Sequence, residues 1–398
     1  MISLWNARQK RQLPDSFIQR GDAGVRKTTA HSEQLKRLYS THSDRLHGKA
    51  GWEKLPMFWF ILFLSYKCTR RCKYCYSFNQ VGDDNIAEMD ERTFSRLLEW
   101  IPEVWRVNNV KVNAVGFLGG EPLLRTDRIR KMMNSVYNNT EGMQGFLYTN
   151  GDLIDSVNWD DLEDIQWIST NITDVPINEL SRRMAIVRER SNVIGQTIVA
   201  TLDDFNLSRI IDISHFGIEN GYRMRYYGNF YQGLEVEYTQ KLLRKYHELC
   251  DLFESYILKG YDVHTVFLFD ILVPLWDDPE SSPYPCGERI ATVYPDGTIG
   301  PCIRNHSLKT GTIFDADPLS KIQCAEFHQN LSIPRLPIEC RTCDSRSTCQ
   351  GGCPNEKLVL RGSTEGKAVL CELHKEIIPR LRNLDQLKNK IKLHKFES

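Results

Sequence analysis

The order of apolar and polar positions divides the chain into a polar start, an alternating middle and a cysteine-dense end. Residues 1–54 are polar and basic, with weak helical periodicity and no strand signal. From Met57 onward, apolar runs of strand length alternate with amphipathic stretches of helical length. We expect strands at 58–66, 110–118, 144–149, 165–171, 193–201 and 221–227. We expect helices at 91–105, 123–138, 152–160, 177–190, 206–217 and 236–259.

The repeated strand and helix unit predicts an α/β fold. Six such repeats imply a parallel sheet that curves into a partial or complete TIM-type (β/α)6 barrel. In a barrel of this kind the functional side chains lie at the carboxyl ends of the strands and in the loops that follow them. The residues that directly follow each apolar run are therefore the candidates for chemistry.

The repeat fades after Pro274, which marks a boundary in the chain. Residues 286–371 are loop-rich and cysteine-dense, so we expect them to bury little apolar core and to need bound metal. Residues 372–398 have helical periodicity and many basic side chains, which favours a solvated, charged helix. We therefore divide the chain into an N-terminal extension (1–54), a barrel (55–275), a cysteine-rich domain (276–375) and a basic C-terminal helix (376–398).

Charge and hydropathy exclude several classes of function. Lys and Arg total 51, as do Asp and Glu, so no overall field recruits nucleic acid or an anionic membrane. The longest apolar run, 57–64, is too short to span a bilayer, and no secretory start is visible. We expect a cytoplasmic protein. In that reducing compartment the 12 cysteines indicate metal or redox chemistry rather than disulfides.

Three cysteines, Cys68, Cys72 and Cys75, follow directly on the first expected strand. Three thiolates in one short loop can ligate three corners of a cubane iron–sulfur cluster. No fourth cysteine is close in sequence, which leaves one iron open for another ligand. A structural zinc ion is the alternative, but zinc usually takes four protein ligands.

The spacing CxxxCxxC, with an aromatic residue before the last cysteine, resembles the signature of the radical S-adenosylmethionine (SAM) superfamily. The resemblance implies a SAM-binding 4Fe–4S cluster, whose reduction cleaves SAM to a 5′-deoxyadenosyl radical. Three motifs at later strand ends, Gly-Gly-Glu-Pro, Thr-Asn-Gly and Ser-Thr-Asn, also resemble the family. The resemblance implies that SAM is contacted by Tyr74, Gly119, Gly120, Glu121, Pro122, Thr149, Asn150, Ser169 and Asn171. Arg182 or Arg183 is a candidate for the SAM carboxylate, although arginines on a helix surface are more often solubilising charges.

The later cysteines are similar in spacing to the seven-cysteine SPASM extension that follows the barrel in many radical SAM enzymes. These seven are Cys286, Cys302, Cys340, Cys343, Cys349, Cys353 and Cys371. Between the first two, Asp296-Gly297 predicts a hairpin turn that brings Cys302 back towards Cys286. A zinc-ribbon-like domain is the alternative, because cysteine pairs also hold zinc.

SPASM domains typically hold two auxiliary 4Fe–4S clusters, so the resemblance implies three clusters in all. It assigns Cys286, Cys302 and Cys353 to the inner auxiliary cluster, nearer the active site. It assigns Cys340, Cys343, Cys349 and Cys371 to the outer one. For the eighth ligand we expect an open or non-cysteine site. A non-cysteine ligand would be a carboxylate from Asp277, Asp278 or Glu280, and the alternative is the thiol of Cys324. Cys250 is interpreted as a buried thiol.

The resemblance implies a peptide maturase that oxidatively crosslinks or otherwise modifies a ribosomally made precursor. Its partners would be that precursor peptide and an electron donor such as flavodoxin or ferredoxin. Residues 1–54 look too short for a winged-helix leader-binding domain, so leader recognition needs either a separate leader-binding protein or a different surface of this chain. Neither nucleic acid nor membrane is an expected partner.

Three alternatives stay open. Anaerobic sulfatase maturation resembles this chain, but that class places a catalytic aspartate directly after the second SPASM cysteine, where this chain has Ile303 and then Arg304. A small-molecule radical SAM dehydrogenase and a non-catalytic, metal-stapled binding protein are the others. A protein of the last kind would not cleave SAM.

The substrate side of the site is not assigned by sequence. The aromatic stretch 222–231 ends the sixth expected strand and places Arg225 or Tyr227 near the expected radical, although a packed barrel rim explains it as well. Glu288, Asp270 and His306 are candidates for proton transfer that the sequence does not rank, so the catalytic residue is unknown.

Overall fold

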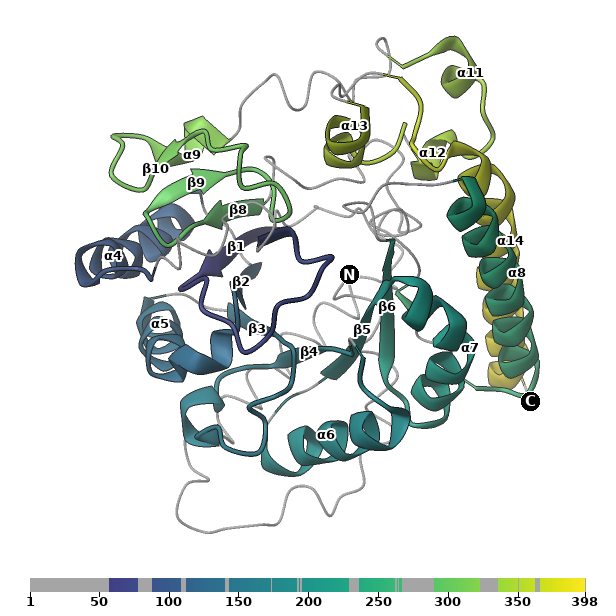
Figure 1. Ribbon diagram of the computed structural model, residues 1–398, viewed down its shortest axis with the longest axis horizontal. Helices are drawn as coiled ribbons and strands as arrows, with labels where there is room; N and C mark the ends of the chain where they lie inside the picture. The colour runs from purple at the N-terminus through teal and green to yellow at the C-terminus, as the bar shows by residue number, and fades with distance from the viewer. Residues whose placement is uncertain are drawn as a thin grey trace.

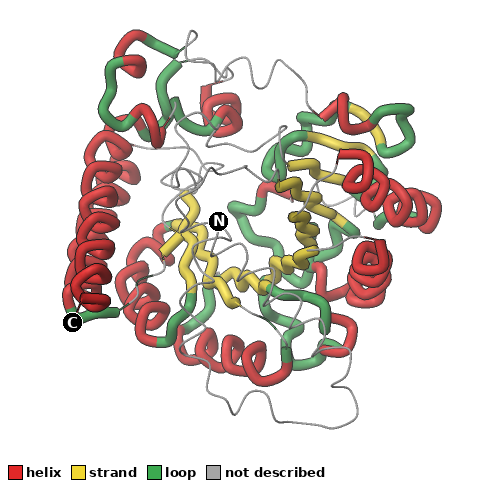
Figure 2. Tube along the Cα trace, turned by 180° about the vertical axis from the view of Figure 1, so that it is seen from behind, coloured by secondary structure: helices red, strands yellow, loops and turns green. Residues whose placement is uncertain are grey.

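The structure is a computed structural model that describes residues 57–77, 88–108, 112–139, 143–172, 174–191, 193, 195–228, 236–261, 263, 265–266, 290–322, 336–349, 351–361 and 366–397. Its frame is a curved ten-stranded sheet in the order β10-β9-β8-β1-β2-β3-β4-β5-β6-β7. Helices cover the outer face of the curve, as Figures 1 and 2 show from opposite sides. The extension 1–54, for which we predicted weak helical periodicity, lies outside the described residues.

Neighbouring strands from β8 through β1 to β7 pair in parallel. Strand β9 pairs antiparallel with both β8 and β10. Their bounds are β1 (Met57–Phe63), β2 (Val112–Leu118), β3 (Met143–Thr149), β4 (Trp167–Asn171), β5 (Gly195–Leu202), β6 (Arg223–Gly228), β7 (Thr265–Val266), β8 (Ile290–Val293), β9 (Thr298–Gly300) and β10 (Gly311–Thr312). All six expected strands are confirmed, and so is the α/β class with a partial barrel.

The helices follow the strands in the expected alternation. Around the barrel they are α4 (Glu91–Asn108), η2 (Pro122–Arg125), α5 (Thr126–Asn139), η3 (Trp159–Leu162), α6 (Ile177–Arg190), α7 (Asp204–Glu219) and α8 (Val236–Leu258). The C-terminal segment adds α9 (Pro318–Ile322), α11 (Ile338–Arg341), α12 (Arg346–Cys349), α13 (Pro354–Arg361) and α14 (Cys371–Glu397). None of the described helices is long and apolar enough to cross a membrane.

The α-helix expected at 152–160 is wrong. This segment forms turns that lead into the short 3-10 helix η3. Gly151 starts it at a φ of +79°, and the Asn158 side chain accepts a hydrogen bond from the Asp160 amide. Short polar side chains that bond to the nearby backbone favour turns over helix, and here they outweigh the helical periodicity.

Alternation along each strand decides which side chains face the inside of the barrel. Phe60 and Leu62 of β1 pack with residues of α4 and α5 in the outer core. Ile61 and Phe63 lie on the opposite, inner face, where they meet Leu118 and other inward residues. The same period-two pattern places the odd-numbered residues of β4 and of β6 on the inner face, because their even-numbered neighbours pack in the outer cores.

The segment after Pro274 buries more core than expected. Strand β8 pairs with β1, and Ala291, Val293, Ile299 and Ile313 join the outer core of the barrel. The expectation that this region buries little apolar surface is therefore wrong for 290–322. The hairpin turn at Asp296-Gly297 is confirmed, because β8 and β9 pair antiparallel around it. Since β8 to β10 continue the sheet, the boundary at 275 stays a prediction.

The C-terminal helix is not a solvated tail. α14 lies alongside α8 (Figure 1) and buries Leu373, Ile377, Ile378, Leu381 and Leu384 in the same core as that helix. Two of its arginines border this buried stripe, because Arg380 pairs with Asp251 of α8 and Arg382 donates to the Thr348 hydroxyl. The expected helix is thus confirmed, but the expectation that it is solvated is wrong. The many basic residues drew attention away from its apolar stripe. Cys250 of α8 is buried in this core, as expected.

Packing of α14 on α8 predicts a clear stability difference between its two faces. Replacing Ile377, which is 2% exposed, with alanine should lower the free energy of unfolding by about 3 kcal/mol. The matched control is Gln386→Ala on the exposed face of the same helix, which should change it by less than about 0.5 kcal/mol. Urea unfolding followed by circular dichroism measures both. Equal effects of the two substitutions would contradict the packing.

Candidate active site

The first cysteine group lies in the loop that leaves β1. Cys68, Cys72 and Cys75 are all half-buried free thiols. Within the loop, the Cys75 amide donates to the Cys72 carbonyl at 3.0 Å, and the Arg70 amide donates to Sγ of Cys68 at 3.4 Å. Burial raises the pKa of the Cys68 and Cys72 thiols. Thiolates in this loop therefore need a nearby cation, and the donor set fits iron ligation.

The Gly-Gly-Glu-Pro motif packs directly on the backbone that enters this loop. The Gly120 amide donates to the Ser65 carbonyl at 2.9 Å, and the Glu121 amide donates to the Lys67 carbonyl at 2.7 Å. Gly119 has a φ of +138°, and a Cβ on Gly120 would collide with the carbonyl oxygen of Lys67. Glycine is therefore required for the ends of β1 and β2 to approach this closely.

The buried carboxylate of Glu121 joins the ends of two strands, β2 and β3. It accepts hydrogen bonds from the Leu123 amide (3.1 Å), the Thr149 hydroxyl (2.7 Å) and the Asn150 amide (2.8 Å). The side chain is 2% exposed, and burial raises its pKa to about 7 although these hydrogen bonds lower it. The motif thus fastens the end of β2 to the end of β3, while the Glu121 amide holds the cluster loop.

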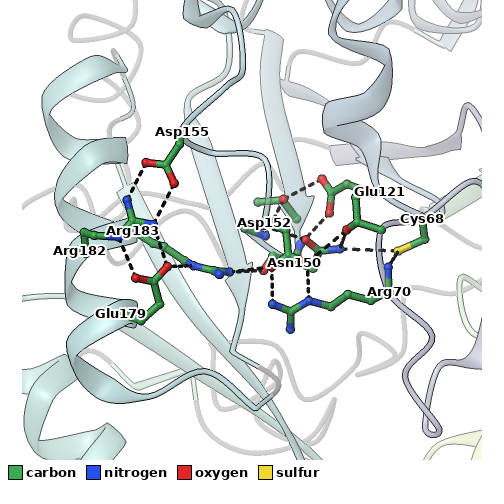
Figure 3. Close-up of polar contacts among 12 residues, drawn as sticks. Cys68, Arg70, Glu121, Asn150, Asp152, Asp155, Glu179, Arg182 and Arg183 are labelled. Atoms are coloured by element: carbon green, nitrogen blue, oxygen red, sulfur yellow. Dashed lines mark hydrogen bonds and ion pairs between the residues drawn. The ribbon is translucent and has the colours of Figure 1, made fainter.

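A chain of alternating charges continues from this point to α6 (Figure 3). Arg70 of the cluster loop makes a two-pronged ion pair with Asp152, with Nε 2.6 Å from Oδ2. Arg183 of α6 donates to Asp152 Oδ1 at 3.1 Å and to the Asn150 carbonyl at 3.1 Å. Glu179 accepts from Arg183 at 2.7 Å. Although burial raises it, the bonds from Arg70 and Arg183 hold the pKa of Asp152 below its usual value.

Asn150 connects the charge chain with the first cysteine group. Its side-chain amide donates to Thr69 Oγ1 at 2.9 Å and lies 3.6 Å from Sγ of Cys68. Its side-chain oxygen accepts from the Asp152 amide at 2.9 Å. One turn of chain therefore contacts both the first cysteine and the residue that holds Arg70.

The other expected SAM contacts are divided between two faces. Ser169 and Asn171 lie on the inner face of β4, on the side of the barrel where Ile61 and Phe63 lie. Thr149 is buried and donates to Glu121 instead. Tyr74 is half-buried next to Cys72, and burial raises its pKa. Their roles in SAM binding stay predictions.

Of the two candidate arginines of α6, Arg183 contacts this site and Arg182 does not. The Arg183 side chain is 13% exposed and bonds to the Thr-Asn-Gly segment, as described above. Arg182 is 46% exposed and pairs with Asp155 and Glu179 on the surface. The sequence named both, and the structure separates them by the face of α6 on which each lies.

Arg225 and Tyr227 of β6, the candidates for the substrate side of the site, lie close to Arg304 of the C-terminal segment. The guanidinium of Arg225 lies 4.9 Å from the ring centre of Tyr227, and that of Arg304 lies 4.3 Å from the same ring. Both contacts fall in the range of cation–π attraction. Arg304 directly follows the Cys302 loop, so this stack joins the end of β6 to that loop.

His306 is buried in a ring cluster rather than exposed to a substrate. Its ring lies 4.8–5.7 Å from those of Phe63, Tyr66, Tyr76 and Tyr294. Burial lowers its pKa to about 4, so the imidazole is neutral near pH 7. The other two candidates for proton transfer, Asp270 and Glu288, lie outside the described residues.

Two contacts join the loop of Cys302 to the helix that follows Cys353. Asn305 donates to the side chain of Asn355 at 2.8 Å, and Arg304 lies 3.8 Å from Glu356. Cys302 itself is buried after β9, where its carbonyl accepts from the Tyr294 hydroxyl at 3.0 Å. The structure therefore brings the segments of these two cysteines together. Cys286 and Cys324, with Asp277, Asp278 and Glu280, lie outside the described residues.

The remaining four cysteines surround one pocket, which we call the outer pocket. It is lined by Glu339, Cys340, Cys343, Ser345, Arg346, Cys349, Gly351, Ala368, Cys371, His374 and Lys375. Within the part of the chain that the structure describes, no three Cys, His, Asp or Glu side chains are close enough together to hold a single metal ion. A cubane binds each thiolate through a different iron, so its ligands surround a wider space than those of one ion.

Sequence reasoning missed two residues at these sites. Asp152 looked like part of a helix, but it directly follows the Thr-Asn-Gly motif, and that position was the available signal. His374 follows Cys371 by three residues, which places both on neighbouring positions of one helix turn. Its Nδ1 lies 3.3 Å from Sγ of Cys349.

Comparison with known proteins agrees with this geometry. Residues 62–205 match the family model of the Radical SAM superfamily, which covers the chain from the end of β1 to the start of α7. A protein named PqqA peptide cyclase from Gluconobacter oxydans (strain 621H) is 23% identical over 341 residues, 78% of this chain and 89% of that protein. A solved structure titled "Native anSMEcpe with bound AdoMet" has the same fold, with a TM-score of 0.67 and 15% identity. That match covers 84% of this chain and 100% of the solved one.

The ion pair of Arg70 with Asp152 predicts that Asp152 stabilises the cluster loop. Asp152→Asn removes the charge from a hydrogen bond worth about 1.5–3 kcal/mol, so iron should leave the first cysteine group several-fold faster. Iron release to a chelator under anaerobic conditions measures this. The matched control is Asp155→Asn, which loses only a surface pair with Arg182 and should behave like the parent. Equal release rates for both variants would contradict the role of Asp152.

The raised pKa of Glu121 predicts a pH-dependent stability. Between about pH 4.5 and 7 the folded chain keeps a proton on Glu121 that the unfolded chain releases, so stability falls as pH rises. Glu121→Gln cannot titrate. The parent should therefore lose free energy of unfolding relative to this variant from about pH 4.5 to 7, as measured by urea unfolding. If the difference in free energy of unfolding between the parent and Glu121→Gln does not change with pH, the raised pKa of the buried Glu121 carboxyl group is contradicted.

Proposed function

We propose that this chain, a radical SAM enzyme by its barrel and its family match, oxidatively modifies a ribosomally made precursor peptide. The match to a protein named as a peptide cyclase carries this proposal. It extends over 341 residues and 78% of this chain, so it reaches beyond residues 62–205. A radical SAM domain implies SAM and one 4Fe–4S cluster as cofactors.

The first cluster would be held by Cys68, Cys72 and Cys75, which leaves one iron for SAM. When bound, the cluster and SAM supply a 5′-deoxyadenosyl radical that abstracts a hydrogen atom from substrate. The residues of this chain around the cluster would position SAM and the cluster rather than react themselves. Glu121 fixes the two strand ends on which SAM would lie, and Asp152 holds Arg70 and Arg183 in place. The proposed SAM-binding residues are Tyr74, Gly119, Gly120, Glu121, Pro122, Thr149, Asn150, Ser169 and Asn171.

Two auxiliary 4Fe–4S clusters complete the proposed electron path. The outer pocket collects Cys340, Cys343, Cys349 and Cys371, which supports the outer cluster. The contacts that join the Cys302 loop to the Cys353 helix support the inner one, with Cys286 as its third cysteine. A crosslink removes two electrons from the peptide. Hydrogen abstraction removes the first, and the auxiliary clusters would accept the second and pass it to a flavodoxin or ferredoxin.

The stack of Arg225, Tyr227 and Arg304 is the proposed substrate-facing rim. Arg225 and Tyr227 belong to β6, and Tyr227 lies next to its carboxyl end, where such enzymes expose their chemistry. Ile303 packs against the apolar inner cluster of the barrel and offers no carboxylate, which argues against the sulfatase-maturing alternative. The precursor peptide would reach this rim, and a separate leader-binding protein would deliver it.

Anaerobic reconstitution tests the catalytic assignment. With dithionite and SAM, the parent should form 5′-deoxyadenosine, detected by mass spectrometry, and should bind about twelve irons if three cubanes are present. The variant Cys68→Ala/Cys72→Ala/Cys75→Ala should form none and keep about eight irons. Zinc in place of iron, with SAM intact in the presence of candidate peptides, would overturn the proposal.

A further inference from the structure

His374 lies against one of the four cysteines of the outer pocket. Its imidazole is 3% exposed, and Nδ1 lies 3.3 Å from Sγ of Cys349. This distance is within the range of a hydrogen bond to sulfur. The residue also lines the outer pocket itself, next to Cys371 on the first turn of α14.

The fold fixes both partners of this contact. Leu373 and Ile377, which flank His374 on α14, are buried in the core shared with α8. From the same helix, Arg382 donates to the Asp344 carbonyl at 2.9 Å and to the Thr348 hydroxyl at 2.8 Å. Thr348 directly precedes Cys349. The histidine and the cysteine are therefore held together by packing on one side and by Arg382 on the other.

We propose that His374 donates a hydrogen bond to the thiolate of Cys349 and thereby raises the reduction potential of the outer auxiliary cluster. The inference rests on the proposed function, because it requires a 4Fe–4S cluster in the outer pocket. A thiolate bound to iron has no proton to give, so Nδ1 must be the donor. Reduction adds negative charge to the cluster and its sulfurs. The hydrogen bond is then stronger in the reduced state than in the oxidised state, which favours electron uptake.

A raised potential suits the outer cluster to its place in the electron path. One electron from the substrate radical would reduce the outer cluster through the inner one, and the electron-carrier protein would reoxidise it. The outer cluster adds no bond-forming step. His374 is therefore a positioning and tuning residue, and it does not touch the peptide or SAM.

Two substitutions of similar size separate hydrogen bonding from packing. His374→Leu fills the space but has no donor, whereas the side-chain amide of His374→Asn places an N–H close to the position of Nδ1. Both are made in the full chain with Cys68→Ala/Cys72→Ala/Cys75→Ala, so that only auxiliary clusters contribute signals. The midpoint potentials are measured by redox titration followed by electron paramagnetic resonance, with iron counted in each sample.

We expect His374→Leu to lower the equilibrium constant for reduction of one auxiliary cluster about tenfold, a downward shift of about 59 mV. The other cluster should keep its potential, and His374→Asn should restore the parent value. No shift in His374→Leu, or the same shift in both variants, would overturn the proposal. If the background chain before any His374 substitution holds no second cluster, the proposed function fails as well, and the iron count alone reveals this.

A second measurement covers the case in which His374→Leu does not assemble its clusters. The background chain is labelled with 15N-histidine, and electron–nuclear double resonance is recorded on its reduced auxiliary clusters. A weak 15N coupling that disappears in His374→Asn supports the hydrogen bond. A spectrum without that coupling contradicts it.

Discussion

The buried carboxylate of Glu121 is the constraint on which the site depends. It is 2% exposed and accepts three hydrogen bonds, two of them from the end of β3. A carboxylate buried in this way is costly unless its bonds are made, so the strand ends are held in the one arrangement that makes them. The amide of the same residue holds the Lys67 carbonyl, immediately before the first cysteine. One residue therefore sets the distance between the cluster loop and the strand ends on which SAM is proposed to bind.

From this point two kinds of contact extend the site through the molecule. The first kind is the ion pair: Asp152 pairs with Arg70 of the cluster loop and with Arg183 of α6, and so connects the two. Backbone pairing, the second kind, connects the site with the C-terminal segment, because β8 adds to the sheet beside β1 and Cys302 follows β9, the antiparallel partner of β8. The three proposed cluster regions are consequently parts of a single framework, in which α14 packs on α8 and lines the outer pocket.

The sequence predicted most of the barrel because its strands are largely apolar and the first four end in recognisable motifs. It failed at 152–160, where short polar residues bond to their own backbone and form turns instead of a helix. It failed also at α14, where a stripe of Leu and Ile is hidden among basic residues. The resemblance to SPASM domains grouped the four cysteines that line the outer pocket. The partners Asp152 and His374 could not, because hydrogen bonds between residues 82 or 25 positions apart leave no periodic signal.

The measurement that tests the central claim most directly is transfer of deuterium from a peptide substrate to 5′-deoxyadenosine. The reconstituted enzyme would be incubated with SAM, reductant and candidate precursor peptides in which deuterium replaces the carbon-bound hydrogens of the side chains. The account predicts deuterated 5′-deoxyadenosine together with a peptide lighter by the mass of the hydrogens lost in crosslinking. Formation of unlabelled 5′-deoxyadenosine with every peptide, and label transfer from a deuterated small molecule instead, would contradict it.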